Sequence, residues 1–186
     1  MYNYLKMSVY LRELNNDMLK LNQRLRITNF IPEGLIQLIE KNVPDNNFIL
    51  GVKYETGECQ ICISGHQKEN ENIDEGCQRE LLEELFLKPK NIVKQNFKIN
   101  NNTFYNLAIR EAYISKSYIE NKGNDLKQRA VVCVHGNEFE ILRYLCKIKT
   151  QDKNNDFISG IWAAKKNKIL AIMKKIKSQC GRYYIY

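Results

Sequence analysis

The sequence contains no apolar run that approaches the roughly 18 residues needed for a membrane-spanning helix. Its start, MYNYLKMSVYLRELNND, lacks the basic segment and apolar block of a secretory signal. There is no internal repeat, and no low-complexity segment apart from asparagine-rich loops. From these absences we expect a cytoplasmic protein with no membrane partner.

Cysteine is present, but not in a pattern typical of disulfides or zinc. The six cysteines are scattered, as buried thiols in a reducing compartment would be. The one Cys-x-x-Cys pair, Cys59 and Cys62, lies in ECQICIS, a predicted strand in which positions i and i+3 point to opposite faces. No second such pair completes a four-ligand zinc site. The sequence therefore predicts structural thiols.

Length and charge favour one folded domain with an appendage and a polyanionic partner. The 186 residues are 44% hydrophobic and 27% charged, values typical of a globular chain. The net charge is +8 and the pI is near 9.1, which favours RNA, a nucleotide or a phosphorylated small molecule as partner. The densest basic run is AAKKNKILAIMKKIKSQ, residues 163–179, and a solvated helix face also explains it.

Hydrophobic periodicity predicts a helical extension followed by an α/β domain. Apolar residues spaced by three and four predict a helix over about 10–27, and a short helix follows at 34–42. We therefore assign residues 1–45 to an N-terminal extension and 46–186 to the main domain. Helices are also predicted around the acidic segment below, over EFEILRYLCKI and in the lysine-rich run. The predicted strands are FILGVKY, CQICIS, IVKQNFKI, TFYNLAIREAYIS and, as the last one, RAVVCVH.

The acidic segment GHQKENENIDEGCQRELLEEL, residues 65–85, is unusual in a basic protein. Asn72 is a good N-cap, and Glu75 completes a capping-box arrangement. Three glutamates then follow within little more than one helical turn, where like charges repel. Arg79 can pair with Glu83, but the remaining charge calls for a cation. Magnesium takes oxygen ligands from a few carboxylates, completed by water and substrate phosphates.

The spacing within this segment resembles the signature of Nudix hydrolases, which spans residues 65 to 87 here. The matching positions are Gly65, Glu71, Arg79, Glu80, Leu81, Glu83, Glu84 and Leu87. The resemblance implies a Nudix-type α/β/α sandwich with a mixed sheet. It also implies hydrolysis of a diphosphate linkage with Mg²⁺ or Mn²⁺ as cofactor.

Roles for individual residues follow from the resemblance by position. It implies that Glu80 and Glu84 ligate the metal with help from the backbone carbonyl of Gly65. It further implies that Glu83 either ligates metal or acts as general base on the attacking water, so all three glutamates are candidate catalytic residues. Arg79 and Glu71 would be supporting residues that orient the helix and the loop.

Two positions depart from the family pattern. Phe86 stands where the family usually has a glycine that ends the helix in a left-handed conformation. We therefore expect the helix to continue until Pro89 stops it. Before Gly65 the chain has Ile63-Ser64 instead of the family's common proline-glycine.

The resemblance also implies a further carboxylate from a loop before the last core strand. Asp125 is the first candidate and Glu120 the second, with a solvated loop charge as the alternative for both. His66 lies close enough to Gly65 to approach a substrate, although an ordinary loop histidine is the favoured explanation.

The motif does not identify the substrate. The basic pI, the lysine-rich segment and the helical extension favour capped RNA, with mRNA decapping that releases m7GDP, as in viral-type members of the family. One alternative is a small-molecule nucleotide diphosphatase acting on nucleoside triphosphates, ADP-ribose or dinucleoside polyphosphates. Another is a non-catalytic RNA-binding or regulatory module. Because Nudix enzymes are often dimers, a homodimer is among the expected states.

Overall fold

The structure is a computed structural model that describes residues 31–54, 59–115, 119–148 and 158–180. The helix predicted over residues 10–27 lies outside these described residues, as do the tyrosines at 183, 184 and 186.

A mixed sheet forms the centre of the molecule. Its seven strands run in the order β2-β1-β8-β6-β5, with β9 beside β1 and β3 beside β8. The β6–β8 pair is parallel and the other pairs are antiparallel. The strands are β1 (Phe48–Tyr54), β2 (Cys59–Ile61), β3 (Ile63–Lys68), β5 (Val93–Ile99), β6 (Asn102–Ala108), β8 (Asp125–Gly136) and β9 (Ile158–Lys165). A separate two-stranded sheet joins β4 (Leu87–Pro89) to β7 (Ala112–Ile114).

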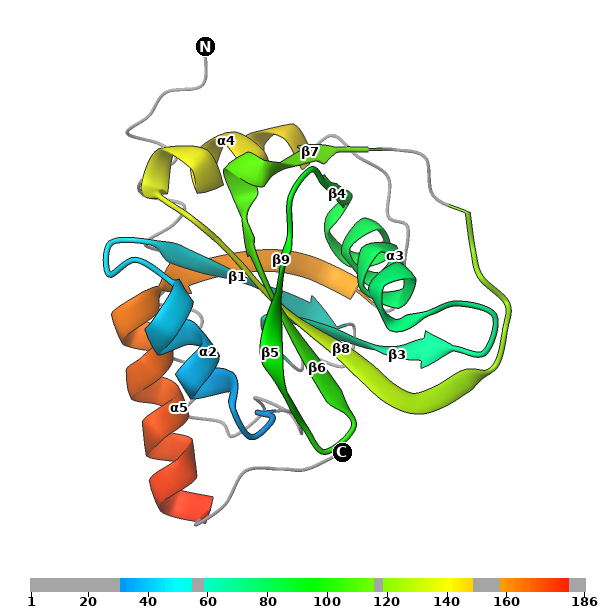
Figure 1. Ribbon diagram of the computed structural model, residues 1–186. Helices are drawn as coiled ribbons and strands as arrows, with labels where there is room; N and C mark the ends of the chain where they lie inside the picture. The colour runs from blue at the N-terminus through cyan, green and yellow to red at the C-terminus, as the bar shows by residue number, and fades with distance from the viewer. Residues whose placement is uncertain (1–30, 55–58, 116–118, 149–157, 181–186) are drawn as a thin grey trace.

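Helices cover both faces of the sheet (Figure 1). α3 (Ile73–Leu85) and α4 (Glu138–Ile148) lie on one face, while α2 (Leu35–Asn42) and α5 (Lys166–Cys180) lie on the other. Two separate hydrophobic clusters correspond to these two interfaces. The predicted α/β class with a mixed sheet is confirmed.

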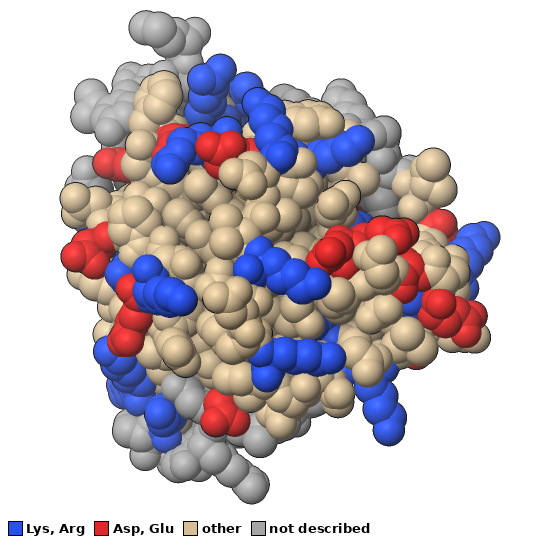
Figure 2. Space-filling model, in the orientation of Figure 1, with Lys and Arg blue, Asp and Glu red and all other residues tan. Residues whose placement is uncertain are grey.

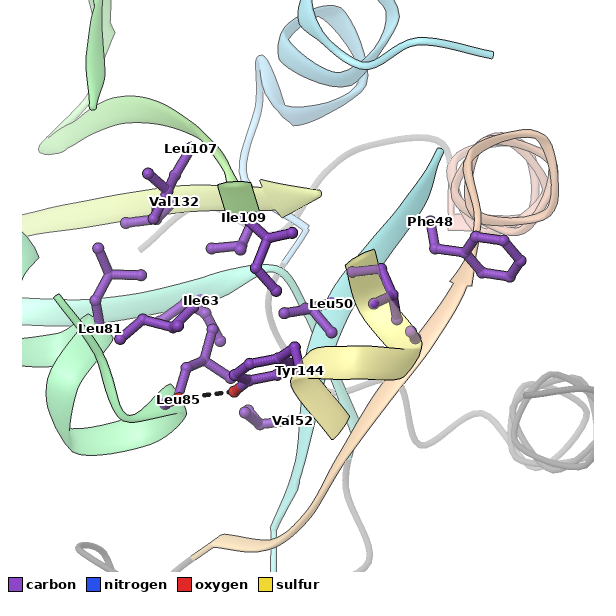
Figure 3. Packing of buried hydrophobic residues seen from close by; sticks show 14 of the residues in the cluster. Phe48, Leu50, Val52, Ile63, Leu81, Leu85, Leu107, Ile109, Val132 and Tyr144 are labelled. Atoms are coloured by element: carbon purple, nitrogen blue, oxygen red, sulfur yellow. Dashed lines mark hydrogen bonds between the residues drawn. The ribbon is translucent and has the colours of Figure 1, made fainter. Parts of the chain in front are cut away.

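Strand β8 shows why the sheet needs two helical layers. Its run of apolar residues alternates between the clusters, with Val132 and Val134 facing α3 and α4, and Val131 and Cys133 facing α2 and α5. A strand buried on both faces reads as a continuous apolar run. Figure 3 shows Val132 beside Leu107 in the first cluster.

A hydrogen bond joins the two helices that share this face. The Tyr144 hydroxyl of α4 donates to the backbone carbonyl of Leu85, the last residue of α3, at 2.7 Å (Figure 3). Both residues are buried in the first cluster. The C-terminal end of α3 is therefore anchored to α4.

The predicted short helix at residues 34–42 is confirmed as α2. Its buried face, formed by Leu35, Leu38 and Ile39, packs into the cluster that also contains Phe104 of β6 and Met173 of α5. α2 therefore shares a core with the sheet. None of the helices in the described part of the chain combines the length and apolar character required to cross a membrane.

The prediction that RAVVCVH is the last strand is wrong. β9 follows α4 and pairs with the whole length of β1, from Phe48 opposite Lys165 to Tyr54 opposite Ile158. α5 accordingly begins at Lys166, so residues 163–165 are strand rather than helix. Long-range pairing with β1 overrides the local pattern. Trp162 is buried on this strand, and its Nε1 donates to the carbonyl of Val52 at 3.0 Å.

Two other predicted strands are interrupted. CQICIS breaks at Cys62, whose φ of 63° lies in the left-handed region. This break places Cys59 and Cys62 in the same buried cluster, so the prediction of opposite faces is wrong. TFYNLAIREAYIS divides into β6, a 3₁₀ turn at Ile109–Glu111 and β7, and β7 pairs with β4 outside the main sheet.

Candidate functional site

The helix α3, which carries the acidic residues, begins as the sequence predicts. Asn72 is the N-cap, and its side chain accepts a hydrogen bond from the Glu75 backbone N–H at 2.8 Å. The Glu75 carboxylate accepts from the Asn72 side-chain amide at 2.6 Å. Asp74 and Glu75 place negative charge in the first turn, which complements the helix dipole.

The end of α3 differs from the prediction. The helix stops at Leu85, and Phe86 itself takes the left-handed conformation, with φ 56° and ψ 26°. The Phe86 backbone N–H closes the last turn on the carbonyl of Leu82 at 3.1 Å. The expectation that α3 continues to Pro89 is therefore wrong. Burial of the Phe86 ring in the core, together with β4–β7 pairing directly after it, favours this conformation despite the missing glycine.

Two neighbouring stripes of α3 are buried, and one of them is acidic. Cys77, Leu81 and Leu85 recur every four residues and pack into the core. The adjacent stripe contains Glu80 and Glu84, which are also buried. Because α3 orients its apolar stripe toward the sheet, the adjacent stripe places the carboxylates of Glu80 and Glu84 in a partly desolvated position.

Gly65 of β3 lies directly against the acidic stripe. A Cβ atom at this position would overlap the side chain of Glu80. Only glycine allows α3 to approach β3 so closely with Glu80 between them. The motif glycine therefore has a packing role that is visible in the structure.

Arg79 is the hub of a partly buried ion-pair network. Its Nε contacts both Glu71 carboxylate oxygens at 3.1 and 3.0 Å, while Nη1 donates to Glu80 at 2.9 Å and to Glu83 at 3.0 Å. Nη2 donates to Glu71 at 3.0 Å and to the carbonyl of His66 at 2.8 Å. These contacts engage all five guanidinium donors. The predicted pairing of Arg79 with Glu83 is confirmed.

The network sets the charge state of its members. Burial disfavours the guanidinium cation, but the hydrogen bonds to Glu71 and the charges of Glu80 and Glu71 outweigh it and raise the pKa of Arg79. Burial likewise disfavours the Glu71 carboxylate, whereas the hydrogen bonds from Arg79 and the Lys68 backbone N–H lower its pKa overall. Glu71 and Arg79 are therefore a fixed ion pair.

For Glu80 and Glu84, in contrast, the surroundings raise the carboxyl pKa. Burial, partly offset by Arg79 and reinforced by Glu83, raises the pKa of Glu80 to about 7. Burial and the charges of Glu80 and Glu83 raise the pKa of Glu84 well above its usual range. Among the described residues, Glu84 Oε2 is buried and has no hydrogen-bond partner. Such an atom is costly unless a cation or a proton satisfies it.

These residues surround an open pocket of about 360 Å³. Glu80, Glu83 and Glu84 line it together with Gly65 and Arg79. Both predicted loop carboxylates, Asp125 and Glu120, also line it. The Asp125 side chain is 56% exposed and pairs with Lys68 at 2.9 Å. The pocket therefore brings together acidic residues that are up to 45 positions apart.

Basic side chains also line this pocket. His66 Nδ1 donates to the carbonyl of Leu126 at 2.9 Å, which leaves Nε2 to accept from Arg129 Nη2 at 2.7 Å. Burial and the charge of Arg129 lower the pKa of His66. Sequence analysis missed Arg129 and Lys68, together with Tyr54, Ser64 and Asn121, which also line the pocket. Arg129 reaches the site only because β8 pairs with β3, and no local pattern reports that pairing.

The carboxylate oxygens of the pocket are suitable ligands for a hard divalent cation. Their side chains do not converge on one point. Within the described ranges, no group of three His, Cys, Asp or Glu side chains is arranged to hold a metal ion. Arg79 Nη1 explains this, because it holds Glu80 and Glu83 by direct hydrogen bonds. The ligand chemistry nevertheless fits, since carboxylate oxygens are preferred by Mg²⁺ and Glu84 Oε2 is buried without a partner.

Comparison of the chain with known protein families, with curated proteins and with solved structures found no match.

Proposed function

We propose that this protein is a metal-dependent Nudix hydrolase that cleaves a diphosphate linkage. The observation that carries the proposal is the buried pair Glu80 and Glu84 on α3, with Glu84 Oε2 unpartnered among the described residues. A purely solvated acidic helix would leave these carboxylates in water. Their burial beside Gly65 and Arg79 agrees with the spacing of the sequence motif.

The α/β/α arrangement is consistent with a Nudix-type sandwich. In this proposal Glu80, Glu84 and the carbonyl of Gly65 hold the ion, and Glu83 either joins them or accepts the proton of the attacking water. Bound Mg²⁺ or Mn²⁺ would activate water and stabilise negative charge on the phosphoryl oxygens. Arg79 orients Glu83 and Glu80 through Nη1, and Glu71 fixes Arg79 in turn.

We propose the 5′ cap of RNA as the substrate, with release of m7GDP. Lys68 and Arg129 line the pocket together with the carboxylates, which supports a polyanionic substrate. The net charge of +8 supports additional contacts to a longer chain of phosphates.

A small-molecule nucleotide diphosphatase is the second candidate. The pocket volume of about 360 Å³ is in the range of small-ligand sites and favours this alternative. A non-catalytic binding module is the third, and the absence of a gathered metal-ligand group in the described part of the chain favours it.

The decisive experiment compares substrates on the purified full chain. The protein is incubated with Mg²⁺ or Mn²⁺ and cap-labelled RNA, free cap dinucleotide, ADP-ribose or nucleoside triphosphates. Glu83→Gln is the test variant, and Glu33→Gln, which alters an exposed carboxylate, is the matched control. We expect m7GDP from capped RNA with the wild type and Glu33→Gln, and none with Glu83→Gln.

Other outcomes identify the alternatives. Turnover restricted to small nucleotides would reject decapping and support the diphosphatase. Binding of RNA without turnover of any compound would support the non-catalytic module.

A further inference from the structure

A second pocket, of about 380 Å³, lies between α4 and the β4–β7 sheet. It shares no lining residue with the acidic pocket. Its walls come from three chain segments: β4 and the residue after it, the 3₁₀ turn with β7, and one face of α4. The proposed hydrolase activity gives this pocket no role.

Positive charge dominates the lining. The basic residues are Lys90, Arg110, Arg143 and Lys147. The acidic lining residue, Glu140, is engaged in capping α4, where its carboxylate accepts from the Asn137 backbone N–H at 3.0 Å. Across the described residues, Lys90, Arg110 and Arg143 make no ion pair. Figure 2 shows Lys and Arg side chains gathered around α4 and β7 at the top of the molecule.

Two exposed aromatic side chains flank these cations. Phe139 is 60% exposed and Tyr113 is 44% exposed, and both line the pocket. Phe139 and Arg143 are four residues apart on α4, so they lie on one face of the helix. The exposed ring of Phe139, which lies beside several cations, is not part of the hydrophobic core. Aromatic faces interleaved with cations are typical of surfaces that stack bases and contact phosphates.

The pocket is built on a fixed frame. The backbone N–H groups of Lys90 and Asn91 donate to the carbonyl of Glu111 at 2.6 and 3.2 Å. The β4–β7 ladder and the Tyr144 to Leu85 hydrogen bond hold the two walls to α3. Tyr113 and Arg143 therefore project from β7 and α4, and the bend at Lys90 is held by backbone hydrogen bonds to Glu111.

We propose that this pocket binds a segment of single-stranded polynucleotide. Phe139 and Tyr113 stack on bases, while Arg143, Lys90 and Arg110 contact the phosphates between them. The net charge of +8 favours a polynucleotide over a mononucleotide, because a longer ligand can also contact cations outside the pocket. This binding involves none of the carboxylates of the acidic pocket, so it is independent of metal and of hydrolysis.

The test measures binding of a fluorescent oligouridylate of about 12 nucleotides, within the usual site size, to the full chain in EDTA. Arg143→Glu is compared with Lys98→Glu, the same charge reversal at an exposed position of β5. Phe139→Ala is compared with Val93→Ala, which truncates another exposed apolar side chain, 53% exposed. Circular dichroism and thermal unfolding check that each variant is folded.

We expect Phe139→Ala to weaken binding between about fivefold and a hundredfold, as loss of a stacked base does. Arg143→Glu should weaken binding and reduce the salt dependence, log K against log salt, by about 0.7 for each phosphate that the variant no longer neutralises. Both controls should stay within about twofold of the wild type. Glu33→Gln, which alters an exposed carboxylate that lines neither pocket, should bind as the wild type does.

Two results would overturn the proposal. One is wild-type affinity in both pocket variants, or affinity decreases no larger than those of their controls. The other is equal affinity for a duplex of the same length, because paired bases are not available for stacking.

Discussion

Gly65 and Glu80 are packed so closely that a side-chain carbon at residue 65 would overlap the Glu80 carboxylate. This contact sets how near α3 approaches β3, and it fixes the position of Glu80 at the edge of the acidic pocket. Residue 65 is therefore a glycine because a side chain would not fit between β3 and the Glu80 side chain of α3. Its backbone conformation does not require glycine.

Gly65→Ala tests this relationship. We expect it to displace Glu80, to lower the free energy of unfolding by about 1–3 kcal/mol and to weaken Mn²⁺ binding. Chemical denaturation and calorimetric titration measure the two effects. Gly160→Ala is the control, because a Cβ at Gly160 meets no atom within 4 Å. Equal stability and metal affinity in the two variants would contradict the packing role of Gly65.

Arg79→Ala should destabilise the protein strongly. The change leaves Glu71, Glu80 and Glu83 without their shared partner, and because these pairs are partly buried the cost should approach the roughly 3–5 kcal/mol of a fully buried pair. The control, Lys174→Ala, breaks an exposed pair with Glu40 and should destabilise the protein far less. Urea denaturation compares both variants. A decrease below about 1 kcal/mol in Arg79→Ala would show that the network contributes no more than a surface pair.

The raised pKa of Glu80, about 7, predicts a pH dependence of stability. Between pH 4.5 and about 7 the folded state binds more protons at Glu80 than the unfolded state does, so this residue makes the metal-free protein less stable as pH rises. The pKa of His135, lowered to about 4 by burial and by Arg110, has the opposite effect between about pH 4 and 6.5.

The difference between the wild type and Glu80→Gln isolates the contribution of Glu80. In EDTA, the free energy of unfolding of Glu80→Gln minus that of the wild type should increase from pH 5 to pH 8. A difference that is constant with pH would show that Glu80 titrates normally. Mn²⁺ affinity of the wild type should increase over the same interval, because ligation requires loss of the proton.

Glu84→Gln should separate stability from function. In the metal-free protein at pH 8, we expect this variant to be at least as stable as the wild type, because it removes a buried charge that repels Glu80 and Glu83. Its Mn²⁺ affinity should fall at least tenfold. Thermal unfolding in EDTA and metal titration measure the two quantities, with the exposed Glu33→Gln as control. Unchanged Mn²⁺ affinity in Glu84→Gln would remove Glu84 from the proposed ligands.

The left-handed conformation of Phe86 predicts an unusual order of stability. Phe86→Gly and Phe86→Ala both lose the buried ring, but only glycine takes φ 56° without strain. We expect the glycine variant to be more stable than the alanine variant by about 1 kcal/mol. At Gln78, an exposed position inside α3, the order should reverse by a similar amount. Alanine above glycine at both positions would be incompatible with the helix ending at Leu85.

Local signals were enough to predict several features of the site. The N-cap at Asn72, the pairing of Arg79 with Glu83 and the acidic face of α3 all depend on residues within a few positions of each other. Helix geometry links such residues directly. The end of α3 was mispredicted at Phe86, because burial of its ring and the pairing of β4 with β7 override the local preference for glycine.

Non-local pairing was outside the reach of the sequence pattern. β9 was missed because its stability comes from β1, more than 100 residues earlier in the chain. Arg129 was missed for the same reason, since β8 brings it to His66 through its pairing with β3. Contacts of this kind depend on strand register and on which strands are neighbours, and a short stretch of sequence specifies neither.

The sequence by itself determined the α/β class, the acidic helix and the order of most of its elements, because periodicity and capping act over one or two turns. Tertiary structure alone decided that Glu80 and Glu84 are buried and that Arg79 engages Glu71, Glu80 and Glu83 together. It also brought Lys68, Arg129 and Asp125 into the lining of the same pocket as the α3 glutamates. The physical reason is that burial and charge compensation are properties of the packed sheet and helix, where desolvation changes the chemistry of each carboxylate.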